Sequence, residues 1–244
     1  MFPEHPETNL INAGIYVLDK RIFPAIREIE KSARGEYELT DAMQLLIGKG
    51  EKIRCHALEK WIDISMPWQL LDANEFILRE HGSQISGSVH ASAIVEEPAA
   101  IGEGAVIGPH CYIRKYSSVG KNCRIVGSEI KNSIIMDGTK LHRCYVGDSV
   151  VGRSCNIAAG TVLANLRLDE KNVSMRINGK SIDTGRRKLG AIVADGVKFG
   201  VNAAVMPGRR IWPGMLIPPC CVVRSDVEAQ PELIDAAKQR QDAS

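Results

Sequence analysis

The chain has 244 residues, a formal net charge of +2 and 44% hydrophobic residues, a composition typical of globular proteins. The near-neutral balance excludes a protein that binds nucleic acid through bulk positive charge, and no apolar run is long enough for a membrane span. The seven cysteines show no C-x-x-C spacing, so we expect reduced thiols in a cytoplasmic protein, with neither a disulfide framework nor a zinc site.

The first 80 residues have the mixed pattern of an α/β fragment. Residues 9–18 and 51–63 favour strands, whereas residues 39–47 and 67–79 have the apolar spacing of amphipathic helices. A segment of this length cannot cover both faces of a sheet. We therefore interpret residues 1–80 as part of a larger α/β domain.

A strict six-residue repeat follows this fragment. An apolar residue recurs at every sixth position from Val89 to Ile125, and again from Val193 to Val223. A helix would need spacings of three and four, and a simple strand would alternate with period two. Each hexad therefore predicts one short strand and one turn, and three hexads complete one coil of a left-handed parallel β-helix. We assign this domain to residues 81–228.

Two segments break the repeat. Between residues 126 and 163 the apolar spacing alternates between five and six, and function is a common reason for such a departure. Residues 166–188 interrupt the repeat altogether and are predicted to form a loop with a hairpin that turns at Asn178-Gly179. Residues 229–244 are expected to be a tail with a capping helix from Pro231 towards Gln241.

Two motifs in the first fragment are Asn12-Ala13-Gly14 and Trp61-Ile62-Asp63. They resemble the end of the nucleotidylyltransferase domain in the archaeal bifunctional sugar-1-phosphate nucleotidylyltransferase/acetyltransferases of UDP-N-acetylglucosamine synthesis. In that family the Asn contacts the sugar and the Asp helps to hold Mg²⁺, whereas the Gly-rich nucleotide loop and the first metal-ligand Asp lie earlier in the chain. Because Mg²⁺ is normally shared among several oxygen ligands, we expect Asn12 and Asp63 to be vestigial. Metal binding and nucleotidyl transfer by this chain alone are not expected.

Two later motifs, Lys140 to Asp148 and Asn156 to Thr161, resemble the acetyltransferase half of the same family. The resemblance assigns the catalytic base to His142 and an oxyanion-stabilising backbone N–H to Ala159. It places an amino-sugar 1-phosphate among the side chains of Arg114, Lys131, Tyr145, Asn156, Asn165 and Lys171. The first glycine of the family's Gly-Ala-Gly stretch is Ala158 here, which leaves the backbone amide in place.

The resemblance also implies acetyl-CoA as cosubstrate and a homotrimer in which the coenzyme lies between neighbouring β-helices. Coenzyme contacts are expected at Ala159, Val201, Arg224 and Arg187. For the basic triplet Arg186-Arg187-Lys188, a solvated loop and contact with phosphates are equally open interpretations. No nucleic-acid or membrane partner is expected.

The chemistry of acetyl transfer suits these residue types. The amine of an amino sugar must lose a proton before it attacks a thioester, and histidine, with a pKa near 6.5, can accept that proton. A fixed backbone N–H stabilises the oxyanion of the tetrahedral intermediate without reorganisation. Arginine and lysine neutralise the sugar phosphate, arginine through a planar fork and lysine as a point charge.

Two other classes of protein share the predicted fold. A γ-type carbonic anhydrase binds Zn²⁺ through stacked histidines, but His90, His110 and His142 are not spaced by multiples of a coil of about 18 residues. A non-catalytic regulatory subunit is the second alternative, and the retained set of candidate residues favours an enzyme over it. The sequence leaves open whether glucosamine or galactosamine 1-phosphate is the acceptor, and where the rest of the nucleotidylyltransferase half resides.

Overall fold

The computed structural model describes residues 9–228, so the capping helix expected from Pro231 lies outside the described residues. The chain falls into two compact units, which span residues 1–63 and 64–244. Among the described residues, no helix combines the length and apolar character that crossing a bilayer requires.

The first unit contains two helices, α1 (Ile22–Glu28) and α2 (Leu39–Gly48). The second of these confirms the helix predicted over residues 39–47. The strands predicted over residues 9–18 and 51–63 are wrong, because the described residues of this unit form no strand. A hydrogen bond from Trp61 Nε1 to the Ala13 carbonyl oxygen (3.2 Å) joins the two segments. A strand is stable only with neighbours that share its backbone hydrogen bonds, and this short unit provides none among its described residues.

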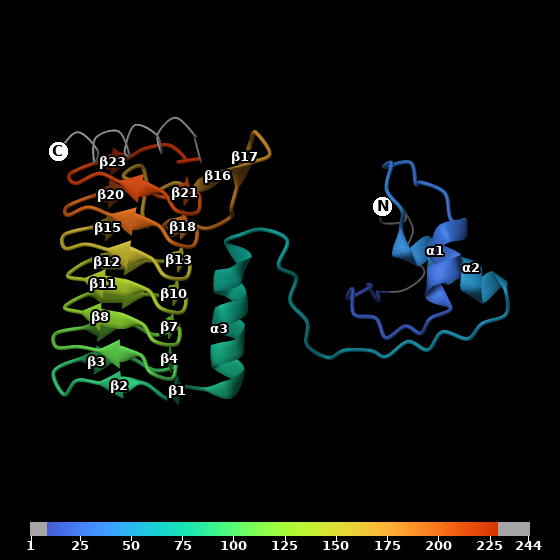
Figure 1. Ribbon diagram of the computed structural model, residues 1–244, viewed down its shortest axis with the longest axis horizontal. Coiled ribbons are helices and arrows are strands. Elements are labelled where there is room, and N and C mark those ends of the chain that lie inside the picture. The colour runs from blue at the N-terminus through green and yellow to red at the C-terminus, as the bar shows by residue number, and fades with distance from the viewer. Residues whose placement is uncertain (1–8, 229–244) are drawn as a thin grey trace, which may run out of the picture. The chain divides into compact units, whose positions relative to one another are not determined.

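The second unit is a parallel β-helix of three sheets with seven strands each. Sheet A contains β1 (Gln84–Ile85), β4 (Ala100–Ile101), β7 (Ser118–Val119), β10 (Ile134–Ile135), β13 (Val150–Val151), β18 (Ile192–Val193) and β21 (Arg210–Ile211). Sheet B contains β2 (Ser88–Val89), β5 (Val106–Ile107), β8 (Arg124–Val126), β11 (Lys140–His142), β14 (Asn156–Ile157), β19 (Lys198–Phe199) and β22 (Leu216–Ile217). Sheet C contains β3 (Ile94–Val95), β6 (Tyr112–Ile113), β9 (Glu129–Lys131), β12 (Tyr145–Gly147), β15 (Val162–Leu163), β20 (Ala204–Val205) and β23 (Val222–Val223). Each coil takes one strand from every sheet, from coil 1 (β1, β2, β3) to coil 7 (β21, β22, β23), as Figure 1 shows.

The predicted parallel β-helix is confirmed, and the hexad residues form its core. Within sheet A, for example, Ile101, Val119 and Ile135 lie directly over one another in successive coils. From Ile101 to Val223 the hexad residues are at most 5% exposed, whereas Val89 in the open first coil is 38% exposed. Each such burial stabilises the fold by about 1.5–3 kcal/mol, so the stacked apolar column holds the coils together.

The loosened spacing after residue 126 corresponds to two shorter coils. Ile101 and Val119 pair at a separation of 18 residues, whereas Val119, Ile135 and Val151 pair at separations of only 16. The shortened corners turn through residues with positive φ, which are Gly127, Asn132, Arg143 and Asp148. Asn and Asp adopt this conformation more readily than other non-glycine residues. These corners border both edges of sheet C, and the candidate site residues follow them.

The helix predicted over residues 67–79 is confirmed as α3 (Gln69–His81), which belongs to the second unit. The compact unit therefore begins before residue 80, where we expected the first domain to end. In Figure 1, α3 runs alongside the strands of sheet A. It packs there through an apolar cluster. Trp68 and Leu71 come from the start of α3, Val150 from sheet A, Val173 and Met175 from the insertion 166–188, and Leu189 from the residue that follows it.

The hairpin predicted within the insertion is confirmed. Its antiparallel strands are β16 (Ser174–Ile177) and β17 (Lys180–Asp183). Asn178 and Gly179 both have positive φ (47° and 77°), as the two central residues of a tight hairpin turn of this type require. Sheet A is thus partly covered by α3 and the insertion.

Candidate active site

The outer face of sheet C collects polar side chains in coils 2 to 4. Strand residues alternate between the two faces of a sheet, so the residues on either side of each core residue point outward. Tyr112, Glu129 and Tyr145 lie side by side in one lane of β6, β9 and β12. Arg114 and Lys131 follow the core residues of the same coils and occupy the next outward lane.

Two carboxylates hold the Arg114 guanidinium. Arg114 Nη1 lies 3.3 Å from Glu129 Oε1, and Arg114 Nε lies 4.0 Å from Glu96 Oε2. Glu96 also accepts hydrogen bonds from the Tyr112 hydroxyl and from the Lys115 backbone N–H (3.2 Å). The bond from Tyr112 is the main reason why the pKa of Glu96 is lowered. Glu96 therefore stays ionised, and the guanidinium keeps a fixed direction on the outer face of sheet C.

Asp148, which the sequence reasoning missed, organises the centre of this group. Its side chain is 6% exposed, and it lies at the shortened corner after β12 with φ of 43°. It accepts hydrogen bonds from Lys131 Nζ (3.4 Å), Asn132 Nδ2 (3.0 Å) and Asn165 Nδ2. A carboxylate this far from solvent needs such partners. The sequence feature that could have pointed to Asp148 is its position as an acidic residue within residues 126–163, where the six-residue spacing is interrupted.

Tyr145 and Asn165 meet over Gly147. A Cβ atom on Gly147 would lie 2.7 Å from both the Tyr145 hydroxyl oxygen and Asn165 Nδ2. Burial is the largest contribution that raises the pKa of Tyr145, followed by the charge of Asp148. The phenol therefore stays protonated at neutral pH and can donate a hydrogen bond to a ligand.

His142 lies at the opposite edge of sheet C, at the end of β11. Its side chain is exposed, and it borders an open hollow on the surface with Pro109, His110, Val126, Gly127 and Arg143. The next two coils place Ala159 and Val201 at the same corner, where the Asn202 N–H donates to the Ala159 carbonyl oxygen (2.8 Å). Among the described residues, the Ala159 N–H has no acceptor. That free donor is the chemical property which an oxyanion site needs.

Other predicted residues lie apart from this face. Asn156 is on the outer face of sheet B, where it pairs in register with Lys140 and Lys198. Lys171 is exposed on the insertion, and its backbone N–H donates to Asp169 Oδ1 (3.3 Å).

The residues predicted to contact the coenzyme also lie in separate places. Arg187 pairs with Glu170 within the insertion. Arg224 is exposed at the end of sheet C in coil 7, three coils beyond Tyr145. Only Ala159 and Val201 lie together with His142 at one corner.

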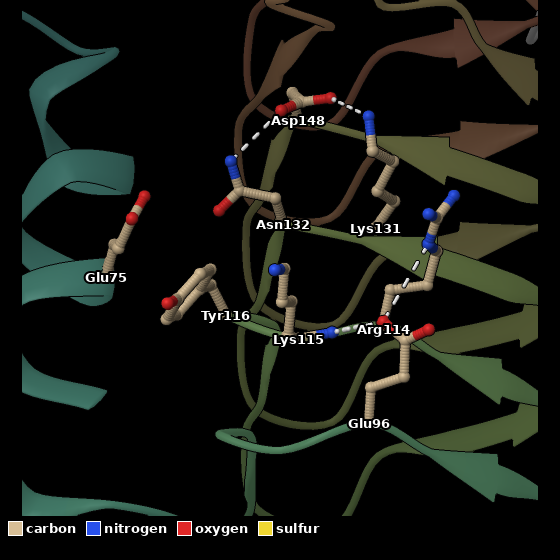
Figure 2. A pocket seen from close by; sticks show the side chains of 8 residues that line it. All are labelled: Glu75, Glu96, Arg114, Lys115, Tyr116, Lys131, Asn132 and Asp148. Atoms are coloured by element: carbon tan, nitrogen blue, oxygen red, sulfur yellow. Dashed lines mark hydrogen bonds and ion pairs between the residues drawn. The ribbon is translucent and has the colours of Figure 1, made fainter. Parts of the chain in front are cut away.

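A pocket of about 220 Å³ lies at the other edge of sheet C. Figure 2 shows Lys131 directed toward Asp148 in this pocket, with Arg114 on the next strand, beside Glu96. Lys115, Tyr116 and Asn132 form its wall at the corner, and Glu75 contributes from α3. The three cations are Arg114, Lys115 and Lys131, and they give the pocket the character of an anion site. The carboxylates of Glu75, Glu96 and Asp148 also line the pocket, so they limit the negative charge of an anion that can bind there.

Asn12 and Asp63 are the two residues of the first unit that the resemblance singled out. Among residues 9–228, no group of three or more His, Cys, Asp or Glu side chains is placed to hold a metal ion. Asp63 is exposed, and the Asn12 amide oxygen accepts the Gly14 backbone N–H (2.9 Å) in a local turn.

Residues 89–234 match the family described as the GMPPB C-terminal domain. The chain belongs to this family. Residues 3–80 match the nucleotidyl transferase family, which agrees with the expected origin of the first fragment and includes α3.

Two curated relatives are similar to this member of the GMPPB C-terminal domain family over nearly its whole length. The bifunctional protein GlmU of Methanocaldococcus jannaschii is 40% identical over 248 residues, which cover 93% of this chain and 60% of that protein. The bifunctional sugar-1-phosphate nucleotidylyltransferase/acetyltransferase of Sulfurisphaera tokodaii is 40% identical over 251 residues, covering 92% and 61%. The resemblance seen in the motifs is confirmed, and the chain spans about three fifths of the length of these relatives.

Among solved structures, a hexapeptide transferase family protein from Anaplasma phagocytophilum is 13% identical. The match covers 67% of this chain and 94% of that chain with a TM-score of 0.34. A likeness at this level carries no argument about function.

Proposed function

We propose that this chain is an acyl-CoA-dependent N-acetyltransferase that acts on an amino-sugar 1-phosphate. One observation carries the proposal, which is the arrangement across sheet C. His142 lies at one edge, Arg114 and Lys131 lie at the other, and Tyr145 lies between them. A sugar that spans this face would present its amine to the histidine and its phosphate to the cations. The name of the Sulfurisphaera tokodaii relative, a bifunctional sugar-1-phosphate nucleotidylyltransferase/acetyltransferase, supports the same assignment.

In this proposal His142 takes the proton that the acceptor amine loses when it attacks the thioester carbonyl carbon. The carbonyl oxygen becomes an oxyanion, which accepts a hydrogen bond from the Ala159 N–H. When the intermediate collapses, the C–S bond breaks, and the imidazolium returns its proton to the departing thiolate of the coenzyme. The amide product and free coenzyme A thiol then leave.

The phosphate end of the acceptor lies in the pocket of Figure 2. Arg114 and Lys131 line this pocket, and in the proposal they donate charge-assisted hydrogen bonds to the phosphate. Glu129 and Asp148 hold these cations in the free protein, so they are oriented before the substrate arrives. Tyr145 and Asn165 contact the sugar ring. Asn156, which lies on a strand of sheet B, comes from a neighbouring subunit, and Lys171 comes from a neighbouring subunit or through movement of the insertion.

A homotrimer is part of the proposal. Sheet A is partly covered by α3 and the insertion, whereas sheets B and C carry exposed apolar residues such as Val106, Val162 and Leu216. A cyclic assembly reuses one patch on every subunit. We place the coenzyme between neighbouring β-helices, in contact with Ala159, Val201, Arg224 and Arg187. Mixing a His142→Ala chain with a chain altered only at Val201 and Arg224 then restores activity through hybrid sites, and an active monomer in light scattering rules the trimer out.

The deciding experiment measures thiol release from acetyl-CoA with glucosamine 1-phosphate and galactosamine 1-phosphate as separate acceptors. Transfer to either acceptor supports the function, and the comparison shows whether one epimer or both are accepted. We expect His142→Ala to lower kcat by ~10²-fold or more, because a general base contributes about that much.

His90→Ala is a matched control for the base. His90 lies at the same corner of the β-helix in coil 1, where its Nδ1 is 2.9 Å from Ser92 Oγ. It should leave kcat unchanged. Near-full kcat in His142→Ala, or no transfer to either acceptor by the wild type, would contradict the proposal.

A further inference from the structure

The three residues of the basic triplet have different environments. Arg186 is 19% exposed and forms an ion pair with Asp72 of α3. Arg187 is 58% exposed and pairs with Glu170 within the insertion. The Lys188 side chain is exposed, and the residue forms an isolated backbone bridge with Leu166. Among the described residues, Arg186 is the member of the triplet whose side chain pairs with another element of the fold.

The backbone around Arg186 closes the base of the insertion, where Val173 faces residues 184–186, which we call the neck. The Val173 N–H donates to the Arg186 carbonyl oxygen (2.9 Å), and the Thr184 N–H donates back to the Val173 carbonyl oxygen (3.1 Å). Below the neck, the Leu189 N–H donates to the carbonyl oxygen of Asn165 (2.9 Å). The position of Arg186 therefore determines where the chain leaves and re-enters the coil, which includes Asn165.

The ion pair lies beside an apolar cluster shared by α3 and the neck. Trp68 and Leu71 come from the start of α3, and Val173, Met175 and Leu189 come from the insertion and its return to the coil. Leu71, Met175 and Leu189 are fully buried. The Arg186 Nε atom is also buried and, among the described residues, has no hydrogen-bond partner. The Asp72 carboxylate is the charge that compensates this largely buried guanidinium, which would be costly to leave unpaired.

We propose that α3 positions the insertion through the Asp72–Arg186 pair, and that Arg186 is a positioning residue that does not contact the coenzyme. The inference rests on the proposed function where it concerns Lys171 and Asn165. The pair fixes the neck, the neck fixes the segment 165–173, and that segment carries both residues towards the acceptor. A helix that lies within the nucleotidyl transferase match thus supports the loop of the acetyltransferase half.

The test compares Asp72→Asn, Arg186→Gln and the charge-swapped double variant Asp72→Arg/Arg186→Asp. Both single variants should raise KM for the sugar phosphate on the order of tenfold, as a displaced substrate-binding group does, with a smaller change in kcat. The swapped pair and Arg186→Lys should recover most of the loss. Arg153→Gln, which breaks an exposed ion pair with Asp195, is the matched control and should change nothing.

The two single variants distinguish a positioning role of the Asp72–Arg186 pair, here called the clamp, from a role of Arg186 in coenzyme binding. If Arg186 bound a coenzyme phosphate, Asp72→Asn would release it and lower KM for acetyl-CoA, whereas Arg186→Gln would raise it. Such opposite effects on acetyl-CoA overturn the inference, and so does an unchanged KM for the sugar phosphate in both variants.

Hydrogen exchange separates a failure of the clamp from a failure of the proposed function. The amides of Val173, Thr184 and Leu189 close the neck, so they should exchange faster in both single variants and recover in the swapped pair. Faster exchange in a protein that transfers no acetyl group supports the clamp and overturns only the proposed function. Unchanged exchange of all three amides in both single variants overturns the clamp, whatever the activity.

Discussion

Replacing Gly147 by alanine tests the arrangement on sheet C most directly. The new Cβ atom would lie 2.7 Å from the Tyr145 hydroxyl oxygen and from Asn165 Nδ2, whereas ordinary contacts begin at 3.4 Å. Both groups must therefore move by about 0.7 Å. Gly147 is in a strand and is not among the residues with positive φ, so alanine fits the backbone itself. The change thus displaces two predicted substrate-binding groups and little else.

We expect kcat/KM for the sugar phosphate to fall by about 10- to 100-fold, because a misplacement of about 1 Å in a binding group costs up to ~10²-fold. The free energy of unfolding should fall by only about 1 kcal/mol, the low end of overpacking, since both contacts are ends of side chains. The thiol-release assay and thermal unfolding measure the two effects on the same preparation.

Gly87→Ala is the matched control. Its Cβ would also lie 2.7 Å from the nearest atom, but that atom is the Ala105 carbonyl oxygen in coil 2, remote from His142 and Tyr145. Backbone cannot move as a side-chain end does, so we expect a loss of about 2–3 kcal/mol of stability with kcat/KM unchanged. Full activity in Gly147→Ala would refute the placement of Tyr145 and Asn165 in the substrate site.

Three further predictions concern other parts of the chain. Leu168 is fully exposed on the insertion, and if it is covered in the trimer, Leu168→Asp should weaken association by about tenfold or more, whereas an unchanged trimer in light scattering argues against that contact. Alkylation at pH 8 followed by mass mapping should label exposed Cys55 and Cys220 quickly. Burial raises the pKa of the thiols of Cys123, Cys144 and Cys155, so they hold less thiolate than free cysteine. They should react only after unfolding, and fast labelling of the native protein would contradict their burial. Ile130→Ala, at a fully buried position of a shortened coil, should cost about 2–5 kcal/mol in chemical denaturation, and a cost below about 1 kcal/mol would contradict tight packing there.

Several elements could be predicted because their signal is local and repeated. The hexads that contain Ile107 and Ile113 each specify one strand and one turn, and the pattern recurs often enough to exclude helix and simple strand. The Asn178-Gly179 turn was predictable because few dipeptides suit two consecutive residues with positive φ. The strands expected over residues 9–18 and 51–63 were wrong because a short apolar pattern cannot show whether pairing partners exist nearby.

The sequence singles out candidate site residues one by one, but it does not show how they are arranged. Motif resemblance singled out His142, Tyr145 and Lys131, yet only the stacking of coils shows that the first lies at one edge of sheet C and the last at the other. Asp148 carries no motif of its own, and its importance comes from the adjacent donors Lys131 and Asn132 and from Asn165, which lies two coils further on.

The sequence by itself determined the period, the apolar column and the turn types, because these depend on residues next to each other along the chain. The tertiary structure alone decided which side chains meet, because groups 16 to 18 residues apart become neighbours only when one coil lies on the next. It also decided that Arg186 pairs with Asp72 across 114 residues, since that contact requires α3 to pack on sheet A. Local chemistry specifies the repeat, and long-range packing specifies the site.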